Sequence, residues 1–205
     1  MWPSECKYDV IDLYQQPGLA RRDEIVGETL AFHRDASLPV RVNLNDLMES
    51  VLYLYAQQLK AKHLRVHKEL EFGGDVVGFP NELRQVISNI FENAIEASPE
   101  SGIVRLRVYT SREHMNSHKP GVRIVIADDG LGIREENAQK IFEPFFTTKG
   151  EKGTGLGLWV CQGIIHKHGG FIRMRSSTNP KHCGTVLSIF LPLKNNSAGV
   201  LVNSA

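Results

Sequence analysis

Asn81-Glu-Leu-Arg-Gln-Val-Ile-Ser-Asn-Ile-Phe-Glu-Asn-Ala-Ile-Glu-Ala-Ser98 is the stretch around which this chain is organised. Its apolar residues recur at helical spacing, and Pro99 and Gly102 follow it, so we expect a helix over residues 81–98. Those apolar residues are Leu83, Val86, Ile87, Ile90, Ala94 and Ile95. Asn89 and Asn93 are four residues apart and therefore project from the same side of the helix. The stretch predicts a helix that presents two amides side by side.

The patterns on both sides of this helix predict a mixture of helices and strands. Helical spacing occurs at residues 21–36, 44–62 and 156–168, and Asn43 or Asn45 is placed to cap the second of these helices. Extended patterns occur at residues 40–42, 64–70, 75–79, 103–110, 122–127, 171–176 and 185–193. Because the strands come in adjacent runs, we expect an α/β (α+β) two-layer sandwich, with a mixed sheet covered on one face by helices.

Length and composition fit one globular domain with a short appendage. The chain has 205 residues, of which 41% are hydrophobic and 23% charged, and we divide it into an N-terminal segment (1–38), a main domain (39–194) and a disordered tail (195–205). A net charge of +1 gives no footprint for nucleic acid or an anionic membrane. The three cysteines have no CxxC spacing, so neither a disulfide framework nor a zinc site is expected. No apolar run is long enough to span a bilayer, and we expect a cytoplasmic domain without direct membrane contact.

The two amides are candidate ligands for a hard cation. Magnesium takes oxygen ligands, and it usually takes only one or two from protein while phosphates and water supply the rest. Asn89 and Asn93 suit that role, and Gln85 and Glu96 lie near the same polar stripe. An isolated asparagine pair is more often a solvated helix face, so the assignment depends on the motifs that follow.

A second motif, Asp128-Asp-Gly130-Leu-Gly132-Ile, follows the apolar run at 122–127. A carboxylate at the end of a strand can accept a hydrogen bond from an exocyclic amine such as that of adenine. The glycines let the backbone approach a flat base closely. An ordinary Asp-Gly turn is the competing interpretation.

A third motif leads into the helix at 156–168. Its residues are Gly153, Thr154, Gly155, Leu156, Gly157 and Leu158. Backbone amides at a helix start can cradle phosphate oxygens. The preceding loop carries Phe142, Phe145, Phe146 and Lys149, so aromatic rings can dock a movable cover while Lys149 reaches the terminal phosphate. A plain helix-capping loop is the alternative. Together the three motifs supply a metal ligand, a carboxylate for the base and a cover for the phosphates of a magnesium nucleotide.

In this order, the motifs resemble the ATP-binding catalytic domain (Bergerat fold) of bacterial two-component sensor histidine kinases. DNA gyrase and the mismatch-repair ATPases share this superfamily, and the resemblance spans residues 40–193. It implies that Asn93 is the principal magnesium ligand, with Asn89 beside it. It also implies that Asp128 binds the adenine amine, in a pocket shaped by Gly130 and Gly132.

The remaining matches complete the resemblance. Residues 142–146 look like the F box, including Phe142 and Phe146, and residues 153–158 look like the second glycine box, which closes on the phosphates. Gly184-Thr185 looks like the last glycine motif, whose threonine supports the adenine-binding aspartate. The resemblance implies ATP and Mg2+ as cofactors and assigns catalysis to Asn89, Asn93 and Lys149, with Lys152 as a second candidate for the terminal phosphate.

The implied partners are a histidine-bearing dimerisation domain, in cis or in trans, and the receiver domain of a response regulator. The full-length protein is expected to form a homodimer, with no nucleic-acid partner. The phosphoacceptor pattern of the family, a histidine followed by an acidic residue and then Pro-Leu, is absent. His33-Arg-Asp-Ala-Ser-Leu-Pro39 is the nearest candidate, and residues 1–38 are better interpreted as a remnant of the dimerisation and phosphoacceptor domain.

A second departure separates the chain from the hydrolases of the superfamily. Those enzymes carry a glutamate four residues before the magnesium asparagine, as general base, and here that position is Asn89. Glu92 projects about 100° away from the amide stripe, so it is a poor substitute. We therefore expect a histidine kinase catalytic domain. A gyrase-like ATPase and a non-catalytic nucleotide-gated module remain as alternatives.

Overall fold

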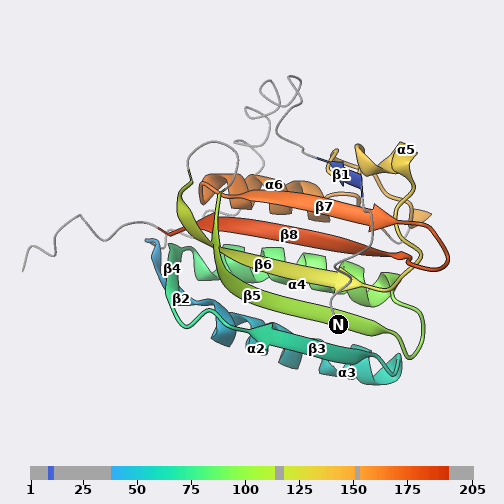
Figure 1. The fold of residues 1–205 in the computed structure, drawn as a ribbon, viewed down its shortest axis with the longest axis horizontal. Helices are drawn as coiled ribbons and strands as arrows, with labels where there is room; N and C mark the ends of the chain where they lie inside the picture. The colour runs from blue at the N-terminus through green and yellow to red at the C-terminus, as the bar shows by residue number, and fades with distance from the viewer. Residues whose placement is uncertain (1–8, 12–37, 114–117, 151–152, 194–205) are drawn as a thin grey trace, which may run out of the picture.

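The computed structural model describes residues 9–11, 38–113, 118–150 and 153–193 (Figure 1). Within these ranges six strands form the main sheet, in the order β1-β7-β8-β6-β5-β3. Their bounds are β1 (Asp9–Ile11), β3 (Arg65–Leu70), β5 (Ile103–Arg112), β6 (Pro120–Asp128), β7 (Phe171–Ser177) and β8 (Gly184–Pro192). Neighbouring strands are antiparallel, apart from the parallel pair β3 and β5. A separate antiparallel pair joins β2 (Val40–Asn43) to β4 (Asp75–Gly78).

The longer helices cover one face of the main sheet (Figure 1). The helices are α2 (Leu44–Leu54), α3 (Ala56–Ala61), α4 (Pro80–Ala97), α5 (Glu135–Ala138) and α6 (Gly157–Lys167). Leu106, Ile124 and Ile126 alternate into the helix side of the sheet and belong to one buried cluster with Ile90 and Phe91 of α4. Each such side chain contributes about 1.5–3 kcal/mol on burial. This layering confirms the predicted two-layer α/β sandwich.

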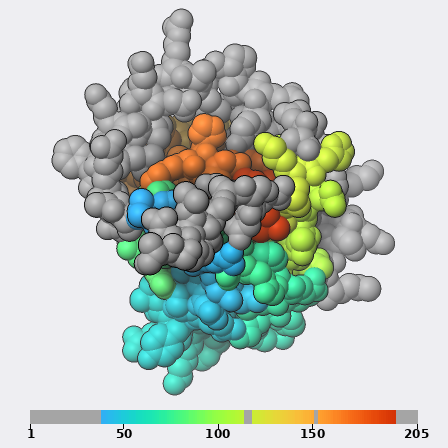
Figure 2. Space-filling view, turned by 90° about the vertical axis from the view of Figure 1, so that its left-hand side faces the viewer, coloured from blue at the N-terminus to red at the C-terminus, as the bar shows by residue number. Residues whose placement is uncertain are grey.

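The end of the molecule that holds the small sheet faces the viewer in Figure 2. There the blue-to-green part of the chain packs beneath the orange part, which belongs to α6 and β7. Asn43 caps α2, because its side chain accepts hydrogen bonds from the backbone N–H groups of Asn45 and Asp46. Asn45 instead donates to the carbonyl of Phe72. The capping question that the sequence left open is thus settled in favour of Asn43.

The predicted helix over 44–62 is wrong in one respect, because it is interrupted at Tyr55. Tyr55 leaves the helical conformation with φ −95° and ψ 6°, and its ring packs edge-on against Phe91 with the centroids 5.6 Å apart. Burial, followed by the nearby Glu92 carboxylate, raises the pKa of the Tyr55 hydroxyl. Glu92 therefore faces Tyr55, in agreement with its predicted direction away from the two amides.

Several predictions concern residues outside the described ranges. They are the helix at 21–36, His33 as a candidate acceptor, Lys152 as a candidate phosphate ligand, and the tail at 195–205. The boundaries of the three predicted segments also stay predictions. The short elements β1 and α5 were not predicted, because runs of three and four residues show no period. Across the parts of the chain that can be described, no helix combines the length and apolarity needed to cross a bilayer.

Candidate functional site

Asp128 lies at the end of β6, and backbone N–H groups from two directions hold its carboxylate. Gly130 donates to its Oδ1 at 2.9 Å, and Thr185 donates from β8 at 3.2 Å. Burial is the largest influence and raises the pKa of Asp128 to about 6, although these hydrogen bonds act in the opposite direction. A carboxylate fixed in this way presents an acceptor at the sheet edge without needing a cationic partner.

Thr185 supports Asp128 through its backbone and not through its hydroxyl. Thr185 lies directly opposite Asp128 in the register of β6 and β8. Its Oγ1 lies 3.0 Å from the hydroxyl of Ser176, which also accepts from the N–H of Ile133 at 2.8 Å. Ser176 therefore ties the loop after Asp128 to β7 and β8. No sequence pattern indicated this role, because one serine in an alternating strand resembles any other.

Gly132 turns this loop back against β7 in a backbone conformation that side chains disfavour. Its φ is +74°, and a Cβ atom at this position would lie 2.1 Å from the carbonyl oxygen of Ser177. Next to it, Asp129 fixes the other side of the loop by accepting from the N–H of Ile103 at 3.0 and 3.1 Å. The close approach seen here is between Gly132 and the backbone of β7, and the predicted approach of this backbone to a flat base stays a prediction.

We expect Gly132→Ala to lower the free energy of unfolding by at least about 2 kcal/mol, because it adds both backbone strain and a steric clash. Denaturant unfolding measures this loss. Gly73→Ala is the matched control, since nothing lies within 4 Å of a Cβ atom there and its φ is not positive. Equal stability of the two variants would contradict the strain argument.

The amide stripe of α4 meets the loop residue Lys149. The Nζ of Lys149 donates to Asn93 Oδ1 at 2.6 Å and forms an ion pair with Glu96. A cation from the loop thus engages the oxygen that the sequence assigned to magnesium. The structure brings the first motif and the aromatic loop together through the contact of Lys149 with Asn93, whereas the predicted contact of Lys149 with the terminal phosphate stays a prediction.

Asn89, one turn earlier, contacts α6 instead. Its Nδ2 donates to the carbonyl of Gly157 at 3.4 Å and lies 3.7 Å from the thiol of Cys161. Burial raises the pKa of the Cys161 thiol to about 12, so this cysteine is an inert core residue. Asn89 therefore links the amide stripe of α4 to the glycine segment at the start of α6. Its Nδ2 group is the donor in this contact.

The aromatic loop and the glycine segment pack against each other. Phe142 is buried and Phe146 packs against the core, whereas Phe145 is 75% exposed. Gly155 has φ +67°, and a Cβ atom there would lie 2.4 Å from the carbonyl carbon of Phe145. Two of the three phenylalanines dock the loop, as predicted, while the third points away.

The first turn of α6 is left without a side-chain cap. The helix begins at Gly157 after Leu156, and no side chain accepts from its first N–H groups. The hydroxyl of Thr154 accepts instead from Leu156 at 3.4 Å, and Gly153 N–H donates to Gly150 at 3.3 Å. The uncapped amides of an eleven-residue helix are suitable donors for phosphate oxygens. Leu158 is partly buried and anchors this turn to the core.

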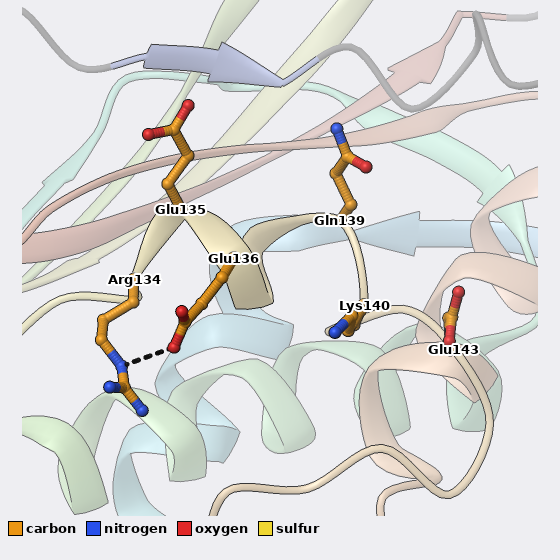
Figure 3. Close-up of a pocket in the computed structure, with 6 residues that line it drawn as sticks. All are labelled: Arg134, Glu135, Glu136, Gln139, Lys140 and Glu143. Atoms are coloured by element: carbon orange, nitrogen blue, oxygen red, sulfur yellow. Dashed lines mark ion pairs between the residues drawn. The ribbon is translucent and has the colours of Figure 1, made fainter.

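A surface hollow of about 640 Å³ lies around α5 and extends to Glu143 in the aromatic loop (Figure 3). It is lined by Arg134, Glu135, Glu136, Gln139, Lys140 and Glu143. The guanidinium of Arg134 lies 3.3 Å from the Glu136 carboxylate, and both are exposed. None of the predicted site residues lines this hollow.

The donor set around α4 suits magnesium that arrives with a nucleotide. Within the described ranges no group of three or more His, Cys, Asp or Glu residues could hold a metal alone. Asn93 offers one neutral oxygen, already aimed at a cation. Magnesium carried by phosphates needs only one or two protein oxygens of this kind. Asn93 fits as the first ligand, with Asn89 beside it.

His168 is a structural histidine. Its Nδ1 lies 2.8 Å from the carbonyl oxygen of Ile164, and its Nε2 accepts from the N–H of Phe79 at 3.1 Å. Both ring nitrogens are therefore used inside the fold, between α6 and the start of α4. This position is unsuited to accepting a phosphoryl group.

A model of the family described as histidine kinase-, DNA gyrase B- and HSP90-like ATPase matches residues 78–195. Sporulation kinase C of Bacillus subtilis is 31% identical over 182 residues, which cover 87% of this chain and 40% of that protein. Sensor histidine kinase ZraS of Salmonella typhimurium is 35% identical over 179 residues, which cover 84% of this chain and 36% of that protein. The chain thus spans well under half of these relatives.

Solved structures show the same likeness. The nucleotide-free catalytic domain of histidine kinase ThkA matches with a TM-score of 0.63 and 33% identity, over 76% of this chain and 96% of that chain. ThkA in complex with the response regulator protein TrrA matches with a TM-score of 0.62 and 30% identity, over 86% of this chain and 48% of that chain.

Proposed function

Because the chain belongs to the family of histidine kinase-, DNA gyrase B- and HSP90-like ATPases and carries the ATP-binding catalytic domain of a histidine kinase, we propose that it binds Mg-ATP between α4, Asp128 and α6. We further propose that it transfers the γ-phosphate to a histidine on a dimerisation domain. The observation that carries this proposal lies on one stripe of α4, where Asn93 contacts Lys149 of the aromatic loop and Asn89, one turn earlier, contacts Gly157 at the start of α6.

Each residue has a separate task in this proposal. Asp128 accepts a hydrogen bond from the adenine amine, in a pocket shaped by Gly130 and Gly132. Asn93, with Asn89 beside it, holds magnesium, which neutralises charge on the phosphates. Lys149 moves from Asn93 to the terminal phosphate, and the amides of residues 153–158 cradle the phosphate oxygens. Most of the rate then comes from positioning and charge stabilisation, since a histidine is already a competent nucleophile.

Asn89 favours transfer to histidine over hydrolysis of ATP. The position has an amide in place of a carboxylate, and Asn89 uses its Nδ2 to hold α6. Glu92 is turned toward Tyr55, so neither side chain supplies a general base for water beside Asn93. This supports the kinase proposal over a gyrase-like ATPase cycle.

The partners follow from the same proposal. The histidine comes from a dimerisation domain, in cis within a longer homodimeric protein or in trans. The phosphoryl group then passes to an aspartate of a response-regulator receiver domain, and the complex of ThkA with TrrA supports a partner of this class. We place these steps in the cytoplasm, without nucleic acid or direct membrane contact.

Calorimetric titration with a non-hydrolysable ATP analogue, with and without magnesium, tests the binding step. We expect binding that magnesium strengthens. Radiolabelled ATP, with a supplied histidine-bearing dimerisation domain, then tests the chemistry. Labelling of that domain supports the kinase, phosphate release without an acceptor indicates an ATPase, and binding without either reaction indicates a nucleotide-gated module. A folded chain that binds no analogue would overturn the proposal.

Replacement of Lys149 by methionine is expected to lower phosphoryl transfer about 10- to 100-fold, because one cation facing the terminal phosphate is lost. Binding of an ADP-like ligand should change little, since that ligand lacks the terminal phosphate. Single-turnover transfer and analogue titration measure the two effects. Lys181→Met, in the exposed turn between β7 and β8, is the matched control. Equal transfer by the two variants would remove Lys149 from the site.

A further inference from the structure

The sheet face opposite the helices carries a concentration of arginines. Residues that are directly opposite in the register share a face, so β3, β5, β6 and β7 place their arginines on the same side. These are Arg65, Arg105, Arg107, Arg123, Arg173 and Arg175. Two described carboxylates pair with arginines on this face, since Glu69 lies 3.1 Å and Glu71, just after β3, lies 3.8 Å from the guanidinium of Arg107. In a chain of net charge +1, this face is strongly positive.

The arginines of β5 and β7 form two columns with small side chains between them. Arg105 on β5 and Arg175 on β7 lie in one row of the register across β6 and β8. Arg107 and Arg173 lie in the next row. Between them lie Ala127, Val125, Val186 and Ser188. The columns are three strand spacings apart, about 14 Å, and the rows are about 7 Å apart. We call this arrangement the arginine frame, defined by Arg105, Arg107, Arg173 and Arg175.

The charges of the arginine frame are only partly compensated. No described carboxylate forms an ion pair with Arg105 or Arg175. Beside the frame, Arg123 donates to the hydroxyls of Ser111 at 3.3 Å and Ser188 at 3.0 Å. Burial, together with repulsion from Arg173 and Arg175, lowers the pKa of Arg123. An incoming anion would relieve this repulsion.

The chemistry of the face favours protein carboxylates over nucleic acid or lipid. Its aromatic rings Phe171 and Phe190 stack on each other with centroids 5.0 Å apart and are 8% and 1% exposed, so neither can stack on a base. Tyr109 lies under the guanidinium of Arg107. Among the residues whose burial is described, none of the large exposed hydrophobic side chains lies on this face, so those residues offer no anchor for a membrane. Arginine pairs with carboxylates in a bidentate manner.

We propose that the arginine frame is a docking surface for an acidic α-helix of a partner protein. A helix is about 10–12 Å wide, which fits between columns about 14 Å apart. Glutamates at i and i+4 along each flank are about 6 Å apart, close to the spacing of the rows. Because the face offers charge and few apolar anchors, the contact is transient and sensitive to salt.

The test uses the full chain and a fluorescent helical peptide with glutamates at i and i+4 on both flanks of an alanine stripe. We expect anisotropy titration to show binding that weakens with added salt. We also expect Arg105→Glu combined with Arg175→Glu to weaken it about tenfold or more. Lys60→Glu, an exposed charge reversal on α3, is the matched control and should bind the peptide normally. The wild-type chain should bind the peptide with glutamates on its flanks and should not bind the same peptide with glutamines there.

Titration of the double variant with the ATP analogue keeps this result separate from the proposed function. Normal analogue binding shows that the variant is folded, and the docking surface would stand even if the wild-type chain transferred no phosphate. Equal peptide affinity of wild type and the double variant would overturn the proposal. So would tighter binding of an oligonucleotide or of anionic phosphatidylserine vesicles to the wild-type chain.

Discussion

Replacement of Asp128 by alanine is expected to lower the affinity for ATP about 100-fold. The carboxylate accepts from Gly130 and Thr185 in the free protein, so it is already fixed for the adenine amine. A hydrogen bond to a charged group is worth about 1.5–3 kcal/mol, and removal also leaves two backbone donors unsatisfied. Calorimetric titration with ATP and with GTP measures the loss. Because GTP has a carbonyl where adenine has the amine, its weak binding should be unaffected by the substitution.

The same residue predicts a pH dependence with two opposite signs. The pKa of Asp128 is raised from 3.8 to about 6, so the folded, nucleotide-free chain binds a proton more tightly than the unfolded chain does. Its contribution to the free energy of unfolding is therefore complete below pH 3.8 and is lost as the pH rises through about 6, on the order of 2–3 kcal/mol. Nucleotide affinity runs the other way, because adenine needs the ionised carboxylate, and it falls as the pH drops below about 6.

Asp128→Asn is the control for both signs, because asparagine keeps the shape and does not titrate. The unfolding free energy of wild type, relative to that of this variant, should fall as the pH rises from 4 to 6.5, because only wild type loses the contribution of the protonated carboxyl. Analogue affinity of the variant should be low and flat over the same range. If neither the analogue affinity nor the free energy of unfolding of the wild-type chain changes with pH in this range, Asp128 does not contact the base.

Replacement of Asn93 by alanine is expected to reduce phosphoryl transfer at least about 100-fold, because the γ-phosphate loses the metal that neutralises its charge. Magnesium should also no longer strengthen analogue binding. Lys149 keeps its ion pair with Glu96 in this variant, so the cover retains one of its two contacts. Titration at several magnesium concentrations, followed by single-turnover transfer, measures both effects.

Asn89→Ala is the matched comparison, one helical turn away on the same stripe. Since the Nδ2 of Asn89 holds the carbonyl of Gly157, we expect this variant to keep most of its magnesium dependence and to lose mainly the docking of α6. If Asn89→Ala loses magnesium dependence while Asn93→Ala retains it, the roles of the two residues are reversed.

The family and the layered fold could be predicted because glycine and asparagine motifs constrain backbone and chemistry at the same time. Gly132 is an example, since its positive φ and its contact with Ser177 leave room for no other residue. The family match, the relatives and the layers of the sheet confirm these predictions. The individual roles assigned to the site residues stay predictions until they are tested.

Other features depend on tertiary contacts that no local pattern encodes. The break at Tyr55 arises from packing against Phe91, although the helical period continues through it. Ser176 acquires its role from the register of β7 with β8. The arginine frame likewise depends on strand order, since Arg105 and Arg175 are far apart in sequence and share one row of the register only because β6 and β8 lie between β5 and β7.

The position of β6 has a kinetic consequence for the two halves of the nucleotide site. β6 is hydrogen-bonded on both sides, to β5 and to β8, so Asp128 ends one of the last elements to open when the domain fluctuates. Lys149 and Gly155 belong to a loop with few backbone hydrogen bonds, which opens at much lower free energy. Hydrogen exchange should therefore be slow at the base and fast at the phosphates. Under the proposed function, spent nucleotide would leave through the phosphate end while the base pocket stays formed, so turnover would not require the core to loosen.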